Sequence, residues 1–114
     1  MRQAGILAAA GLYALEHNVQ RLAEDHRNAR QLAARLQQIP AISITPETVA
    51  TNMLFFDVHS TRLSVSAFIA ALKQEGVLIN AVGGHTCRAV THLDVSADAI
   101  ERAGDRIARV LAHE

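Results

Sequence analysis

The sequence predicts an α/β domain in which helices pack on one face of a small, mostly antiparallel sheet. Three observations support this class: the first 38 residues are helix-forming and contain no proline, short apolar strand candidates follow, and two more amphipathic helices alternate with the strands. The expected order is α-α-β-β-α-β-β-α, and strands this short suit a sheet covered by helices on one side. A chain of 114 residues has room for one domain with a modest core.

Residues 1–38 are expected to form an N-terminal helical segment of two helices with a break near residues 16–19. Residues 6–12 are apolar nearly all round, which is typical of a helix that is covered on every side. An unbroken 38-residue helix would be about 57 Å long, too long for a compact domain of this size. An apolar seam with alternating steps of four and three residues joins Leu15, Val19, Leu22, His26, Ala29, Ala33 and Leu36.

Residues 39–114 are expected to form the α/β sandwich of the same single small domain. Pro40 ends the helical segment, and residues 41–45 form the first strand candidate. Residues 51–58 alternate two largely apolar sets of side chains, so this strand is expected at the centre of the sheet. Residues 77–79 and 86–92 are the other two expected strands, with a turn at Gly83-Gly84 between them.

Ser64 and Ser96 are expected to cap the two remaining helices, because each is flanked by apolar residues in the positions of a hydrophobic staple. The helix after Ser64 is expected to end at Gly76. The periodicity predicts that the first of these helices buries Val65, Phe68, Ile69 and Leu72, and that the last helix buries Ile100, Ala103, Ile107, Val110 and Leu111.

Composition excludes several classes of function. Eleven basic and eleven acidic residues cancel, so the chain has no electrostatic footprint for nucleic acid or an anionic membrane. No apolar run reaches the roughly 18 residues of a membrane span, and the N-terminus lacks a signal-peptide layout, so a cytoplasmic protein is expected. Cys87 is the lone cysteine, and His85-x-Cys87 lacks a third ligand, so neither a disulfide nor a metal site is predicted.

Arg88 is the most informative candidate for a binding residue. It lies in an otherwise uncharged strand, and an unpaired buried charge is costly. Its planar guanidinium suits a carboxylate. The partner is either a ligand or an internal acid, namely Asp57, Asp94 or a glutamate. His92-Leu93-Asp94 is compatible with a general base and its orienter, but also with a simple strand end.

Five segments together are similar to the C-terminal part of the low-specificity L-threonine aldolases, which are pyridoxal-phosphate enzymes of the aspartate-aminotransferase fold type (fold type I). They occur in the family's order and spacing and are spread along essentially the whole chain: residues 1–15 (MRQAGILAAAGLYAL), 22–26 (LAEDH), 51–56 (TNMLFF), 76–81 (GVLINA) and 88–96 (RAVTHLDVS).

The resemblance implies a small C-terminal domain that closes over a large domain, which holds most of the pyridoxal-phosphate site. In the family the Schiff-base lysine lies before the position of Met1, and Lys73 does not match it. This chain alone is therefore expected to be inactive and to bind no cofactor. Arg88 matches the arginine that binds the substrate carboxylate. Arg2 matches an arginine near the cofactor phosphate.

For the complete enzyme, the resemblance implies cleavage of threonine or allo-threonine to glycine and an aldehyde. It also implies that the apolar first helix is covered by the large domain and a neighbouring subunit. We therefore expect this chain to form a homo-oligomer through residues 4–15. The alternative is a non-enzymatic α/β module for carboxylate binding or dimerisation.

Overall fold

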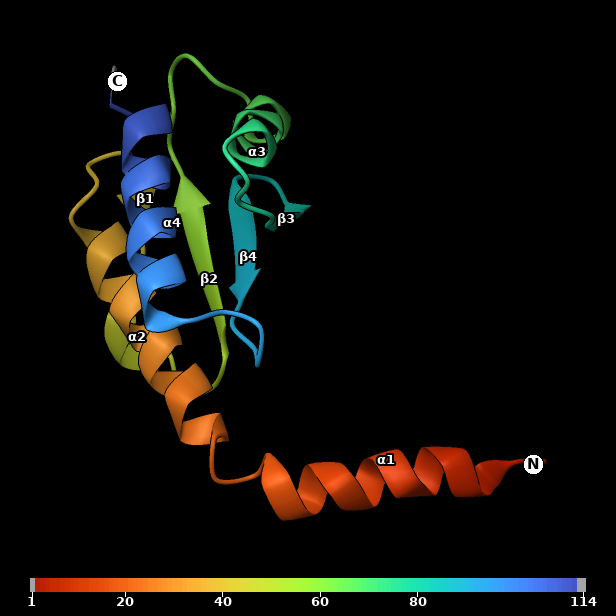
Figure 1. Cartoon of the computed structure of the whole chain (residues 1–114). Coiled ribbons are helices and arrows are strands. Elements are labelled where there is room, and N and C mark those ends of the chain that lie inside the picture. Colours follow the sequence, from red (N-terminus) through yellow and green to blue (C-terminus); the bar gives the residue numbers. More distant parts are fainter. Residues whose placement is uncertain (1, 113–114) are drawn as a thin grey trace.

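The structure, a computed structural model, describes residues 2–112, so Met1 of the first segment of the resemblance lies outside the described residues. Helices cover one face of a four-stranded sheet (Figure 1), and the predicted α/β class is confirmed. The elements in chain order are α1 (Ala4–His17), α2 (Leu22–Gln37), β1 (Ile42–Ser43), a 3-10 turn η1 (Pro46–Thr48), β2 (Met53–Val58), α3 (Val65–Gln74), β3 (Asn80–Gly83), β4 (Thr86–Val90) and α4 (Ala97–Val110).

The sheet has the strand order β1-β2-β4-β3, and every neighbouring pair is antiparallel. The prediction that residues 51–58 form a central strand is confirmed, because β2 lies between β1 and β4. Leu54, Phe56 and Val58 point into the core, whereas Met53 and Phe55 on the other side of β2 are 42% and 51% exposed. One face of the sheet is therefore covered by helices, and the other is open.

The core lies between the covered face of the sheet and helices α2, α3 and α4. Ala29, Ala33 and Leu36 of the predicted seam are buried, and Leu32 joins them. The seam prediction is wrong at its start, because Leu15, Val19 and Leu22 are exposed. The chain changes direction between α1 and α2, so the seam does not continue along one helix face. His26, the seam's polar member, is only partly buried.

Both predicted helix caps are confirmed. The Ser64 hydroxyl accepts a hydrogen bond from the Ala67 amide, and the Ser96 hydroxyl accepts one from the Ala99 amide, each at 3.2 Å. Gly76 ends α3 with a φ of 77°, a conformation that glycine adopts without strain. In the first of these helices Phe68 and Leu72 are fully buried, and in α4 Ile100 and Ile107 are buried, as expected.

The segment between α3 and β4 differs from its prediction. Residues 77–79 do not form a strand; β3 begins at Asn80 instead. The amide of Val77 bonds back to the carbonyl of Leu72, which keeps the chain tied to the end of α3 before it reaches the sheet. The turn lies at Gly84-His85, one residue later than predicted, and β4 ends at Val90 rather than at residue 92.

Helix α1 projects from the rest of the molecule (Figure 1), and none of its residues is buried. The principal extents are 52 × 28 × 23 Å, and the radius of gyration is 16.4 Å, compared with roughly 13 Å for a compact chain of this length. The sequence led us to expect a covered helix. The described residues of this chain leave α1 uncovered. None of their helices is long and apolar enough to cross a membrane.

Candidate functional site

The open face of the sheet carries the candidate site. Antiparallel pairing places Phe55 of β2 and Asn80 of β3 directly beside Arg88 of β4. Because side chains alternate along a strand and Cys87 and Ala89 are buried, Arg88 points to the open face. Directly paired residues have Cβ atoms about 5 Å apart, so the three side chains form one row across three strands.

Within residues 2–112 the guanidinium of Arg88 has no counter-ion. Arg88 is partly buried, its Nε is fully buried, and this Nε has no hydrogen-bond partner. Among residues 2–112, no acidic side chain forms an ion pair with Arg88, including Asp57 and Asp94, which we considered as partners. A buried donor without an acceptor is rare in native proteins, so this Nε calls for an acceptor other than the described side chains, such as a ligand oxygen or a water.

Asp57 is the nearest acid in the strand register. It lies on β2, two residues after Phe55, which pairs with Arg88. Asp57 pairs with Thr86, and the Thr86 hydroxyl donates a 2.5 Å hydrogen bond to its carboxylate. A hollow of about 370 Å³ on this side of the sheet is lined in part by Phe55, Asp57 and Thr86. The hollow extends toward β1 and η1 and is not lined by Arg88, so the open face carries the hollow and the unpaired cation as separate features.

Arg2 is not brought near Arg88. It is exposed and precedes α1, whose N-terminal end lies far from the sheet (Figure 1). The structure therefore joins only one of the two predicted site residues to the body of the domain, and the role expected of Arg2 stays a prediction.

The histidine and cysteine candidates form no catalytic set in the described part of the chain. Nδ1 of His92 accepts a hydrogen bond from the amide of Asp94, so this pair closes a local turn after β4. Cys87 is buried, and burial, with a smaller effect of Asp57, raises the pKa of its thiol. Within residues 2–112, no group of three metal-ligating side chains comes together.

A buried polar cluster that we did not predict joins the start of α2 to the residue just before β2 and the residue just after β4. The Thr91 hydroxyl donates to the carbonyl of Asp25 at 2.7 Å, and the Asn52 amide donates to the carbonyl of Thr91 at 2.8 Å. Arg21 forms a bidentate pair with Asp25, at 2.8 and 3.1 Å, and this hydrogen bonding raises the pKa of Arg21. Three of these residues lie in segments of the resemblance, and here they build the domain.

The described residues do not fit the covalent site of pyridoxal phosphate. A lysine that acts together with Arg88 would have to lie on the open face of the sheet, and Lys73 does not. It is exposed near the end of α3. Phe68 and Leu72 of the same helix pack into the core against the covered face of the sheet, opposite to the face of Arg88.

Taken together, fold and site define a small α/β domain that presents an unpaired arginine on the open face of an antiparallel sheet. The family model of the beta-eliminating lyases matches residues 1–59, which is just over half of the chain. The chain therefore belongs to the beta-eliminating lyase family, and the expected family resemblance is confirmed.

Individual relatives extend this match across almost the whole chain. It is 44% identical over 113 residues, 99% of its length, to "Low specificity L-threonine aldolase" of Escherichia coli strain K12, covering 30% of that protein. It is 35% identical over 97 residues, 84% of its length, to "Low-specificity L-threonine aldolase 1" of Arabidopsis thaliana, covering 27% of that protein. The chain thus spans less than a third of the length of these relatives.

Proposed function

We propose that this chain is the C-terminal small domain of a low-specificity L-threonine aldolase. In the complete lyase, Arg88 binds the carboxylate of threonine or allo-threonine, and the products are glycine and an aldehyde. The observation that carries this proposal is the unpaired guanidinium of Arg88 on the open face of the sheet. The similarity to threonine aldolases along 99% of the chain supports it.

The chemistry expected of Arg88 is binding and orientation. Its fork of N–H donors matches the two oxygens of a carboxylate, and both oxygens can be held at once. Fixing the carboxylate restricts rotation of the amino acid and so helps align the bond that is broken. Phe55 and Asn80 flank Arg88 in the register and limit the directions from which a carboxylate can approach it.

Pyridoxal phosphate is the expected cofactor of the complete enzyme, where it supplies the electron sink for bond cleavage. The amine that holds the cofactor is proposed to come from a large domain outside this chain, and the exposed position of Lys73 near the end of α3 supports this. This chain alone is accordingly proposed to be inactive. Arg2 is proposed to contact the cofactor phosphate once α1 is seated against that large domain.

The test is steady-state kinetics of a full-length protein that carries this chain. Arg88→Ala should raise KM and lower kcat for threonine, and kcat/KM should fall about 10- to 100-fold, the usual cost of a lost charged hydrogen bond. Arg88→Lys should recover only part of the loss, because it keeps the charge but not the fork. Arg27→Ala removes an exposed arginine of α2 and is the matched control. Unchanged kinetics in Arg88→Ala would refute the assignment.

The non-enzymatic alternative rests on the same residue. A carboxylate-binding or dimerisation module would use Arg88 without any lyase activity in the full-length protein. Threonine cleavage by that protein, together with the visible absorbance of bound pyridoxal phosphate, would exclude the alternative. Specific binding of pyridoxal phosphate by the present chain would instead contradict the proposal that its amine comes from elsewhere.

A further inference from the structure

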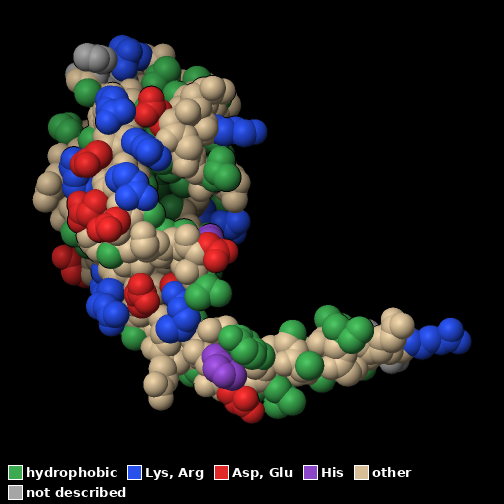
Figure 2. All heavy atoms as spheres, viewed as in Figure 1, with side chains coloured by type: hydrophobic (Ala, Val, Ile, Leu, Met, Phe, Trp, Pro, Cys, Tyr) green, Lys and Arg blue, Asp and Glu red, His purple; other side chains and the backbone are tan. Residues whose placement is uncertain are grey.

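A second pocket, separate from Arg88, opens between α4 and residues 76–79, the segment that leads from α3 to β3. Its volume is about 240 Å³, larger than the roughly 150 Å³ cavity that is known to hold a benzene molecule. Buried Leu32, Ala89 and Ile100 form part of its apolar lining. Figure 2 shows this hollow as a recess with hydrophobic side chains inside it and basic side chains on its margin.

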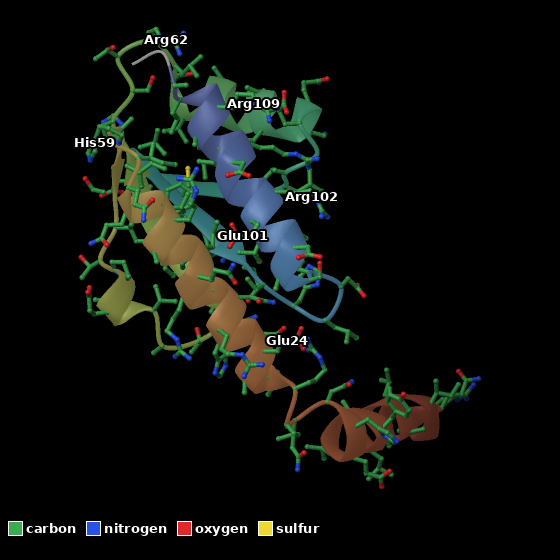
Figure 3. All side chains as sticks on the ribbon, turned by 60° about the vertical axis from the view of Figure 1, so that its left-hand side comes forward. Glu24, His59, Arg62, Glu101, Arg102 and Arg109 are labelled. Atoms are coloured by element: carbon green, nitrogen blue, oxygen red, sulfur yellow. The ribbon has the colours of Figure 1, made fainter. Side chains whose placement is uncertain are left out.

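The charged residues that line the pocket are both arginines. Arg102 and Arg106 lie one helical turn apart on α4, and the lining contains no acidic residue. Like charges at this spacing destabilise a helix by about 0.2–0.5 kcal/mol. Figure 3 shows Arg102 directed away from α2, toward the side of α4 that faces the α3–β3 segment.

Three other arginines of the body form ion pairs. Arg21 pairs with Asp25, Arg35 with Asp105 and Arg109 with Glu75. Within residues 2–112, neither Arg102 nor Arg106 forms an ion pair, although Asp98 lies one turn before Arg102. What sets Arg102 and Arg106 apart is that both line an apolar pocket, so two positive charges that form no ion pair within the described residues lie beside apolar surface.

We propose that this pocket binds a small organic anion with a short apolar body, of the class of a medium-chain carboxylate. The apolar body would cover Leu32, Ala89 and Ile100, and each buried methylene contributes roughly 0.8 kcal/mol. The carboxylate would lie between the guanidinium groups of Arg102 and Arg106, relieving their mutual repulsion. The site is independent of the proposed aldolase function, because Arg88 does not line it.

The experiment is a ¹H–¹⁵N NMR titration of this chain with three probes: hexanoate, hexanol and acetate. Hexanoate carries both recognition elements, hexanol lacks the charge and acetate lacks the apolar body. The proposal expects hexanoate to shift the amide signals of Leu78, Ala99 and Ala103 and to bind more tightly than either other probe. Acetate binding as tightly as hexanoate would overturn it, because the apolar pocket would then contribute nothing.

Two matched double variants separate the pocket from general charge effects. Arg102→Gln with Arg106→Gln should weaken hexanoate binding about fivefold, to the level of hexanol, since partly exposed ion pairs contribute modestly. Arg27→Gln with Arg30→Gln removes the same charge from exposed positions on α2 and should leave binding unchanged. Equal hexanoate affinity in both variants, or shifts confined to other surfaces, would refute the proposal.

Ala103→Leu gives a further readout that does not depend on charge. The added side chain would occupy part of the pocket, so binding of both hexanoate and hexanol should be lost while the spectrum of the folded domain is retained. Undiminished hexanoate binding by this folded variant would place the ligand elsewhere.

Discussion

We expect this chain to self-associate through α1, and the exposed apolar surface of the helix allows the strength of association to be estimated. The helix exposes five large apolar side chains, each between 59% and 72% accessible: Ile6, Leu7, Leu12, Tyr13 and Leu15. Covering each would contribute about 1–2 kcal/mol, so the helix offers about 5–10 kcal/mol per copy. Association itself costs at least about 4 kcal/mol. In a dimer the two helices together offer about 10–20 kcal/mol. With a middle value of about 15 kcal/mol and an association cost of about 10 kcal/mol, about 5 kcal/mol is left, which corresponds to a dissociation constant on the order of 0.1 mM.

The assay is light scattering coupled to size exclusion, repeated over a range of protein concentrations up to about 1 mM, so that the range spans the expected dissociation constant. Replacing Leu7 and Leu12 with Gln should weaken association roughly thirtyfold or more, because about 2 kcal/mol or more of apolar burial is lost. Leu78→Gln is the control, since Leu78 is 77% exposed but lies on the body rather than on α1. A monomer at the highest concentration, or equal association of all three proteins, would refute the reasoning.

Three further predictions concern the stability of the domain. Thr91→Val should lower the free energy of unfolding in urea by about 1 kcal/mol, because the hydrogen bond to the carbonyl of Asp25 is lost; an unchanged value would mean that the buried polar cluster does not stabilise the fold. Gly104→Val should cost about 1–3 kcal/mol, because a Cβ at Gly104 would lie 2.6 Å from Cγ of Arg35; a variant as stable as the parent would show that the two helices separate freely. Burial raises the folded-state pKa of the Cys87 thiol. The contribution of this thiol to the free energy of unfolding should therefore be complete below the unfolded-state pKa and be lost as pH rises above about 9. A difference in unfolding free energy between the parent and Cys87→Ala that stays constant with pH would contradict this.

The features that could be predicted from the sequence are those decided by nearby residues. The caps at Ser64 and Ser96 depend on side chains three residues away, and Gly76 ends α3 because it adopts a positive φ. The central position of β2 followed from its sequence, since both sets of its alternating side chains are largely apolar, although one of these sets lies on the open face of the sheet. These features depend on residues that are close together in the sequence, so they can be predicted without knowledge of tertiary contacts.

The features that were missed depend on contacts between distant segments. Residues 77–79 have strand-forming side chains, yet Val77 and Ile79 pack on the core without joining the sheet, and Leu78 faces solvent. Likewise, Thr91 and Asp25 are 66 positions apart, and no spacing rule relates them. The position of Arg88 on a strand was predictable. That Asp57 does not pair with Arg88 could be known only from the strand register, which places Asp57 beside Thr86 instead.

Two apolar regions of the molecule are uncovered: the open face of the sheet and helix α1. They differ in the cost of covering them with a second copy, and this cost indicates which of them forms the interface. The open face of the sheet contains the unpaired charge of Arg88, so a second copy that covered this face would have to supply an anion there or bury a cation without a partner. The ionisable side chains Glu16 and His17 of α1 both lie at its C-terminal end and Tyr13 is uncharged, so a second copy can cover residues 4–15 without burying a charged group. Self-association is therefore expected to use α1 and leave Arg88 open. Adding residues 4–17 as a separate peptide should compete with self-association but not change the accessibility of Arg88, and protection of Arg88 from an arginine-modifying reagent on dimerisation would show that the sheet face is the interface instead.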